Sequence, residues 1–140
     1  WKTAEQIEEK YILKQGDFLF ARSGATAGKT LLYKKEHGKA LFAGYLIKFE
    51  TKREKLLSPF LDFILKADFY KNWVIDKRKG AAQPNINAQQ FASFEIPLVT
   101  LEEQKKIVSR QEKLKDQMSK LEIQLEAIPK RIENVMRKYL

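Results

Sequence analysis

The last forty residues of this 140-residue chain carry apolar side chains at every third or fourth position, and this pattern restricts the fold most. They contain no glycine and a single proline. Two seam positions of a heptad repeat run through the segment, and the residues between them are mostly Lys, Glu, Gln and Arg. The first seam position reads Gln104, Gln111, Met118, Leu125, Ile132 and Tyr139. The second reads Ile107, Leu114, Leu121, Ile128 and Val135. The pattern predicts one long amphipathic helix and leaves about 100 residues for one domain.

Capping signals indicate where this helix begins. Thr100 followed by Glu103 forms a capping box, which predicts a helix start at residue 101. Pro129 lacks a backbone donor, so we expect a kink or a break there. Gln104 and Gln111 are read as polar breaks that set the register of the seam. The apolar stripe needs a partner, which is the chain's own domain, a second copy or another subunit. The expected coiled-coil interface comprises Ile107, Leu114, Met118, Leu121, Leu125, Ile128, Ile132 and Val135.

Residues 1–100 read as one α+β domain with a mixed or antiparallel sheet and a packed helix. Strand patterns occur at 18–22, 31–35, 41–50 and 93–96. One helix is expected from Ser58, as its cap, to Arg78 or Lys79, with Gly80 behind it. A short helical turn is expected at 88–91. The predicted organisation is therefore a domain at 1–100 followed by the spacer helix at 101–140.

Composition excludes several kinds of chemistry. The chain has no cysteine and one histidine, so a disulfide scaffold, a cysteine-ligated zinc site and a thiol nucleophile are ruled out. No apolar run is long enough to span a membrane. The net charge is +9, and residues 22–55 hold nine basic side chains against three acidic ones, a local excess of six. This excess of positive charge favours a polyanionic partner. Nucleic acid is the first candidate, and an acidic membrane surface is the second.

Two loops offer polar groups to such a partner. Residues 24–30 (Gly-Ala-Thr-Ala-Gly-Lys-Thr) are similar to a phosphate-binding loop but have three residues, instead of four, between the glycines. ATP binding is therefore disfavoured, whereas Arg22, Lys29 and Thr30 can still hold a DNA phosphate or a base edge. Residues 83–87 (Gln-Pro-Asn-Ile-Asn) can form paired hydrogen bonds to adenine, or their asparagines can simply cap the turn.

Catalytic patterns are weak. Asp17, Glu50 and Lys52 mimic the acids and lysine of metal-dependent nucleases, but Glu-x-Lys recurs by chance and a solvated strand end is preferred. His37 lies in a turn rich in lysine and glycine and has no evident partner for general-base work. We therefore expect no catalytic residue and no metal site.

Three sequence blocks resemble the target-recognition domain of type I restriction–modification specificity subunits. The first is 16–30 (Gly-Asp-Phe-Leu-Phe-Ala-Arg-Ser-Gly-Ala-Thr-Ala-Gly-Lys-Thr), and the second is 83–87 with Phe91, Phe94, Ile96 and Pro97. The third is 101–108 (Leu-Glu-Glu-Gln-Lys-Lys-Ile-Val), similar to the start of that family's long helix. The blocks occur in the right order over about residues 9–135. The family's domain usually begins several dozen residues earlier, so we expect a partial subunit.

The resemblance implies a DNA reader without its own catalytic site, located in the cytoplasm. Each recognition domain would read half of a bipartite duplex site, while two long helices would pair as an antiparallel coiled coil. Methyltransferase and restriction subunits would bring S-adenosylmethionine, ATP and magnesium, so this chain needs no cofactor. The expected DNA-binding residues are Arg22, Ser23, Lys29, Thr30, Lys34, Lys35, Lys79, Gln83, Asn85 and Asn87.

The residues also leave two other functions open. A protein-interaction module could use the coiled coil alone, with an incidental basic surface, and would dimerise without salt-sensitive DNA affinity. A nucleotide-dependent enzyme would gain thermal stability with ATP or a metal. For a DNA reader, removing the charges of Lys34 and Lys35 is expected to weaken binding to all sequences and to flatten its salt dependence.

Overall fold

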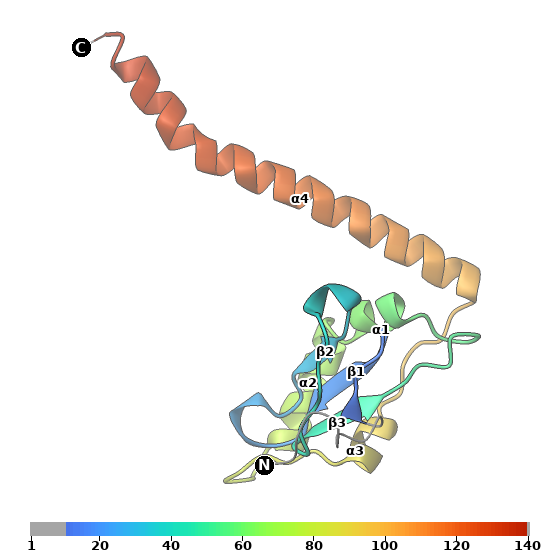
Figure 1. Cartoon of the computed structure of the whole chain (residues 1–140). Helices are drawn as coiled ribbons and strands as arrows, with labels where there is room; N and C mark the ends of the chain where they lie inside the picture. Colours follow the sequence, from blue (N-terminus) through green and yellow to red (C-terminus); the bar gives the residue numbers. More distant parts are fainter. Residues whose placement is uncertain (1–10, 140) are drawn as a thin grey trace. The chain divides into compact units, whose positions relative to one another are not determined.

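The computed structural model describes residues 11–139 and divides the chain into two compact units, Trp1–Lys105 and Lys106–Leu140. Within the described residues the fold is α+β, as the sequence predicts, with a small antiparallel sheet, several helices and one long C-terminal helix (Figure 1). The part of the predicted domain before residue 11 lies outside the described residues. Each unit is described by itself below.

The sheet has three strands in the order β2-β1-β3, so β1 is central. The strands are β1 (Phe18–Ala21), β2 (Thr30–Leu32) and β3 (Leu46–Phe49), each shorter than its sequence pattern. β1 pairs antiparallel with both neighbours, placing Phe20 opposite Thr30 and Ile47. Phe18 and Phe20 pack into the main core, whereas Leu19 packs into a smaller cluster, because successive side chains point to opposite faces.

The single helix expected after Ser58 is two helices, α1 (Ser58–Ile64) and α2 (Asp68–Arg78). Ile64 and Tyr70, six residues apart, would point about 120° apart on one straight helix, at about 100° per residue. The break at 65–67 lets both side chains enter the core, where each is 3% exposed. Ser58 is the first helical residue and not the N-cap; its hydroxyl donates to the Gly16 carbonyl.

The segment after α2 is partly as expected. The predicted turn at 88–91 is the helix α3 (Ala88–Ala92), capped by Asn87. The predicted strand at 93–96 is wrong, since these residues pair with no strand. Phe94 instead packs its ring against Tyr70 and Trp73, with centroid distances of 5.1 Å to both. Ring packing on α2, and not a backbone ladder, closes this side of the domain.

Gln104 corrects the interpretation of the helix seam. Its side chain is fully buried within the first unit and belongs to the domain, not to an exposed seam. The side-chain oxygen accepts from the Leu57 amide at 2.9 Å. The side-chain nitrogen donates to the carbonyls of Lys55 at 2.8 Å and Val99 at 2.9 Å. This glutamine thus fastens the first turn of the long helix to the loop before α1.

Replacing Gln104 with leucine is expected to lower the free energy of unfolding by about 3 kcal/mol, because three backbone groups lose their buried partner. Chemical denaturation measures the change. Gln111→Leu is the matched control, since Gln111 is half-buried one heptad later, and it is expected to change stability by less than about 0.5 kcal/mol. Equal losses in the two variants would contradict the anchoring role.

The long helix α4 (Leu101–Met136) begins at the predicted residue. Thr100 and Glu103 form the predicted capping box, with the Glu103 amide donating to the Thr100 hydroxyl at 3.3 Å. The helix continues through Pro129, so the expected break does not occur, although the ribbon bends along its C-terminal third (Figure 1). From Leu114 to Val135 the seven apolar seam residues are between 44% and 64% exposed. No described helix is long and apolar enough to cross a membrane.

Candidate nucleic-acid interface

Two segments far apart in sequence meet at one end of the sheet. The Ile86 amide donates to the Arg22 carbonyl at 2.7 Å, and the Gly24 amide donates to the Pro84 carbonyl at 3.0 Å. A β-bridge joins Ser23 and Asn85. Ile86 is fully buried and pins its loop, whereas Asn85 on one side of it is exposed. We call this region, built by residues 22–29, 43–45 and 83–87, the loop end of the sheet.

Arg22 and Asn85 form a side-chain pair at the loop end. The Arg22 Nε donates to the Asn85 Oδ1 at 3.4 Å, in an exposed position. Guanidinium and amide groups are the side chains that form paired hydrogen bonds with guanine and adenine edges. The structure therefore brings together Arg22 and Asn85, two of the expected DNA-binding residues, while Gln83 is exposed in the same loop as Asn85.

The glycine-rich loop does not have the geometry of a phosphate-binding loop. The amides of Gly24, Ala27, Gly28 and Lys29 all donate to protein carbonyls and are not free to wrap an anion. Gly28 has a φ of +87°, and a Cβ there would lie 2.3 Å from the Val74 Cγ1 on α2. The second glycine thus serves close packing against a helix, and the exposed Lys29 side chain is the loop's cationic group.

A buried tyrosine holds the same loop on α2. The Tyr70 hydroxyl donates to the Gly28 carbonyl at 2.8 Å. Burial raises the pKa of the Tyr70 phenol, so the group remains a neutral donor. The loop that carries Arg22 and Lys29 is therefore fixed from behind by packing and by a buried hydrogen bond.

The three segments of the loop end contain no aspartate or glutamate. Arg78, at the end of α2, adds a further cation, because its Nη2 donates to the Ala25 carbonyl at 3.4 Å. Its neighbour Lys79 instead pairs with Asp76 at 2.5 Å. Arg78 could not be predicted from the sequence, because its place beside the loop depends on the packing of α2.

The remaining expected DNA-binding residues lie either at or next to the loop end, or at the opposite end of β2. Asn87 caps α3, with its Oδ1 accepting from the Gln90 amide at 2.9 Å, so its capping role is real. Thr30 is the first residue of β2 and directly follows Lys29, the last residue of the first loop-end segment. Lys34 and Lys35 follow the other end of β2, so the structure does not bring them together with Arg22.

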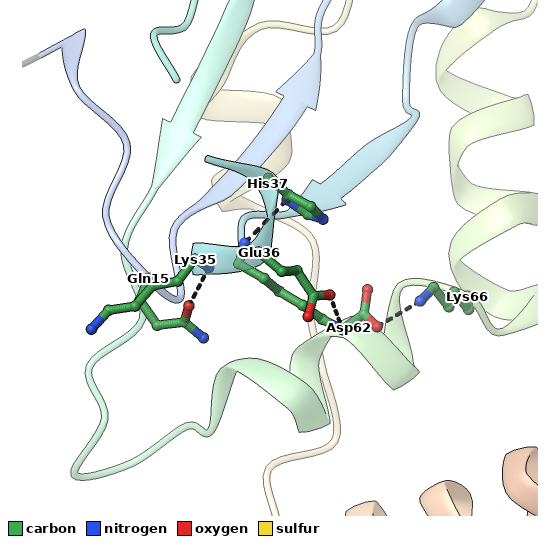
Figure 2. Close-up of polar contacts among 7 residues, drawn as sticks. Gln15, Lys35, Glu36, His37, Asp62 and Lys66 are labelled. Carbon is green, nitrogen blue, oxygen red and sulfur yellow. Dashed lines mark hydrogen bonds and ion pairs between the residues drawn. The ribbon is translucent and has the colours of Figure 1, made fainter. Parts of the chain in front are cut away.

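Lys35 and His37 belong to the short helix η4 (Lys35–His37), and polar groups around this helix form hydrogen bonds with one another (Figure 2). The His37 Nδ1 accepts from the Lys34 amide at 3.2 Å, and the Lys35 amide donates to the Gln15 side chain at 2.6 Å. Lys34 forms an exposed ion pair with Glu36 at 3.3 Å. His37 is therefore a turn residue, and the Lys35 ammonium is the group left for solvent.

The nuclease-like acids are tied into local ion pairs. Lys48 lies between Glu50 at 2.7 Å and Asp17 at 3.7 Å, and Asp17 also accepts from the Lys14 amide at 2.8 Å. The hydrogen bond between Lys48 and Glu50 raises the pKa of the lysine and lowers the pKa of the glutamate. Among the described residues, no three His, Cys, Asp or Glu side chains come close enough together to hold a metal ion.

The chain thus has a small α+β domain with basic side chains at the loop end of its sheet, followed by a long helix, and comparison with known proteins gives its family. The chain belongs to the family of the type I restriction modification DNA specificity domain, whose model matches residues 2–133. It is similar to the type I restriction enzyme MjaVIII specificity subunit of Methanocaldococcus jannaschii, with 25% identity over 137 residues. The match covers 98% of this chain and 31% of that relative, so the chain spans about a third of the relative's length.

Proposed function

We propose that this chain reads one half of a bipartite DNA site for a type I restriction–modification complex, with the loop end of the sheet facing the duplex. The observation that carries the proposal is the exposed Arg22–Asn85 pair, held by loop segments whose own sequences contain no carboxylate. Arg22 and Lys29 on these segments attract a polyanion. Membership in the DNA specificity family supports the same reading.

Within this proposal the side chains read bases, hold phosphates or support the loop. Arg22, Gln83 and Asn85 read base edges in the major groove. Ser23, Lys29 and Thr30 hold phosphates next to the reading pair, and Asn87 supports its loop as a helix cap. Lys79, which follows α2 and pairs with Asp76, holds a further phosphate. Lys34 and Lys35, which follow the other end of β2, contact phosphates farther along the duplex.

Arg22→Ala in the intact protein tests the proposal. The variant is expected to lose about 10- to 100-fold in affinity for its target duplex, because a bidentate base contact contributes roughly 1–3 kcal/mol of discrimination. Its affinity for unrelated duplexes is expected to fall much less. Fluorescence anisotropy with target and scrambled duplexes measures both affinities.

The Lys34→Ala/Lys35→Ala variant is the matched comparison. It is expected to weaken target and scrambled duplexes equally and to reduce the slope of log K against log salt by roughly 0.9 per lost phosphate contact. Lys34 already pairs with Glu36, so most of the effect should come from Lys35. If Arg22→Ala also weakens both duplexes equally, Arg22 is a phosphate contact and the base-reading role is wrong.

The helix α4 is the proposed spacer and assembly element. Its exposed stripe from Leu114 to Val135 supports pairing with a second helix of the same kind. Methyltransferase and restriction subunits would dock on this assembly and supply catalysis, with S-adenosylmethionine, ATP and magnesium bound to them. Because the complex acts on DNA inside the cell, we also propose a cytoplasmic location.

A further inference from the structure

Tyr45 is the most exposed large apolar side chain among the described residues of the domain, at 64%. It lies in the turn that precedes β3. The pairing of β1 with β3 runs from Phe18↔Phe49 to Ala21↔Leu46, so the next pair is Arg22 and Tyr45. The Arg22 amide donates to the Tyr45 carbonyl at 3.2 Å, which confirms this pairing.

A backbone contact places Tyr45 beside the reading pair. Tyr45 directly precedes Leu46, the first residue of β3, and its carbonyl accepts from the Arg22 amide. Because this hydrogen bond joins the two backbones, the exposed Tyr45 side chain begins close to Arg22, whose Nε donates to the Asn85 Oδ1.

A single exposed aromatic residue does not by itself indicate a binding site, since apolar atoms make up much of any protein surface. Tyr45 points to one because it lies beside Arg22. The loop end already holds a guanidinium and an amide, which suit guanine and adenine edges, and its other large apolar residue, Ile86, is fully buried. Thymine differs from every other base in the major groove by its C5 methyl group, which is recognised by apolar contact.

We propose that Tyr45 is a specificity-determining residue that recognises the C5 methyl group of a thymine next to the base pair read by Arg22 and Asn85. The inference rests on the proposed DNA-reading function and names one element of the target. The phenol ring supplies the apolar surface. The base contact of the neighbouring Arg22 places this ring next to the adjoining base pair.

The test begins with selection from a pool of randomised duplexes by the intact protein and by its Tyr45→Ala variant. The wild type is expected to enrich a sequence with thymine at one position that Tyr45→Ala no longer discriminates. Deoxyuridine then replaces that thymine in the selected duplex and removes only the methyl group. Wild-type affinity should fall by about three- to tenfold, while the affinity of Tyr45→Ala should not change.

Two control variants separate a specific contact from a general loss. Tyr45→Phe keeps the ring and should keep the deoxyuridine penalty. Leu31→Ala removes another exposed apolar side chain, 49% exposed on β2, and should enrich the same sequence as the wild type. If Tyr45→Ala enriches an unchanged sequence with an unchanged deoxyuridine penalty, this inference is wrong although the proposed function holds. If the wild type enriches no sequence, both fail.

Discussion

Replacing Gly28 with alanine is expected to lower the free energy of unfolding by about 3 kcal/mol or more, because the added methyl group overlaps α2. The added Cβ would lie 2.3 Å from the Val74 Cγ1 and 2.8 Å from its Cγ2. A non-glycine residue at a φ of +87° adds backbone strain to this overlap. Urea denaturation of the wild type and the variant measures the change.

Gly24→Ala is the matched control for Gly28→Ala. Gly24 also has a positive φ, +69°, but nothing lies within 4 Å of its built Cβ. This control is expected to lose only about 1–2 kcal/mol, from backbone strain. Adding Val74→Ala to Gly28→Ala removes the two nearest atoms and should recover part of the lost stability. Equal losses in Gly24→Ala and Gly28→Ala would show that packing against α2 does not explain this glycine.

Replacing Leu121 with aspartate is expected to raise the dissociation constant for self-association of the chain by at least about 100-fold. Leu121 is 58% exposed on the seam of α4, and pairing of two such helices would bury it. A carboxylate buried there without a partner opposes association strongly. Sedimentation equilibrium measures the dissociation constant.

Ile123→Asp makes the same chemical change away from the seam. Ile123 is 64% exposed on the same helix but occupies neither heptad seam position. It is expected to change the dissociation constant by less than about threefold, because its side chain remains in solvent after pairing. If both variants weaken association equally, the helices pair through a different face. A wild-type chain that stays monomeric at high concentration would contradict pairing between copies.

Local rules predicted much of the fold. The capping box of Thr100 and Glu103 specifies the start of α4, because both partners lie within one turn. The apolar run Phe18–Ala21 is also a local signal, and it specifies β1. The division of the helix after Ser58 could not be predicted locally, since it depends on how Ile64 and Tyr70 both reach the core.

Gln104 shows the limit of periodicity most clearly. It occupies a seam position of the heptad repeat, so the pattern assigns it to the coiled coil. Its actual partners, the backbone groups of Lys55 and Leu57, lie almost fifty residues earlier in the chain. A polar residue at the first heptad of such a helix can therefore be a contact to the preceding domain.

The candidate site was predictable in its parts but not in its arrangement. Arg22 and Asn85 were each identified from residue type and loop context. Their pairing depends on a β-bridge across 62 residues of sequence, between Ser23 and Asn85. Tyr45 and Arg78 were missed because their positions at the loop end come from strand register and helix packing.

The most direct test of the DNA-reading role is the binding of the intact protein to randomised duplexes over a range of salt concentrations. A DNA reader is expected to enrich one defined sequence, with log K falling linearly against log salt and with retained preference for the target at every salt concentration. A protein-interaction module with an incidental basic surface would dimerise, enrich no sequence and show no salt-sensitive DNA affinity, and that result would contradict the proposed function.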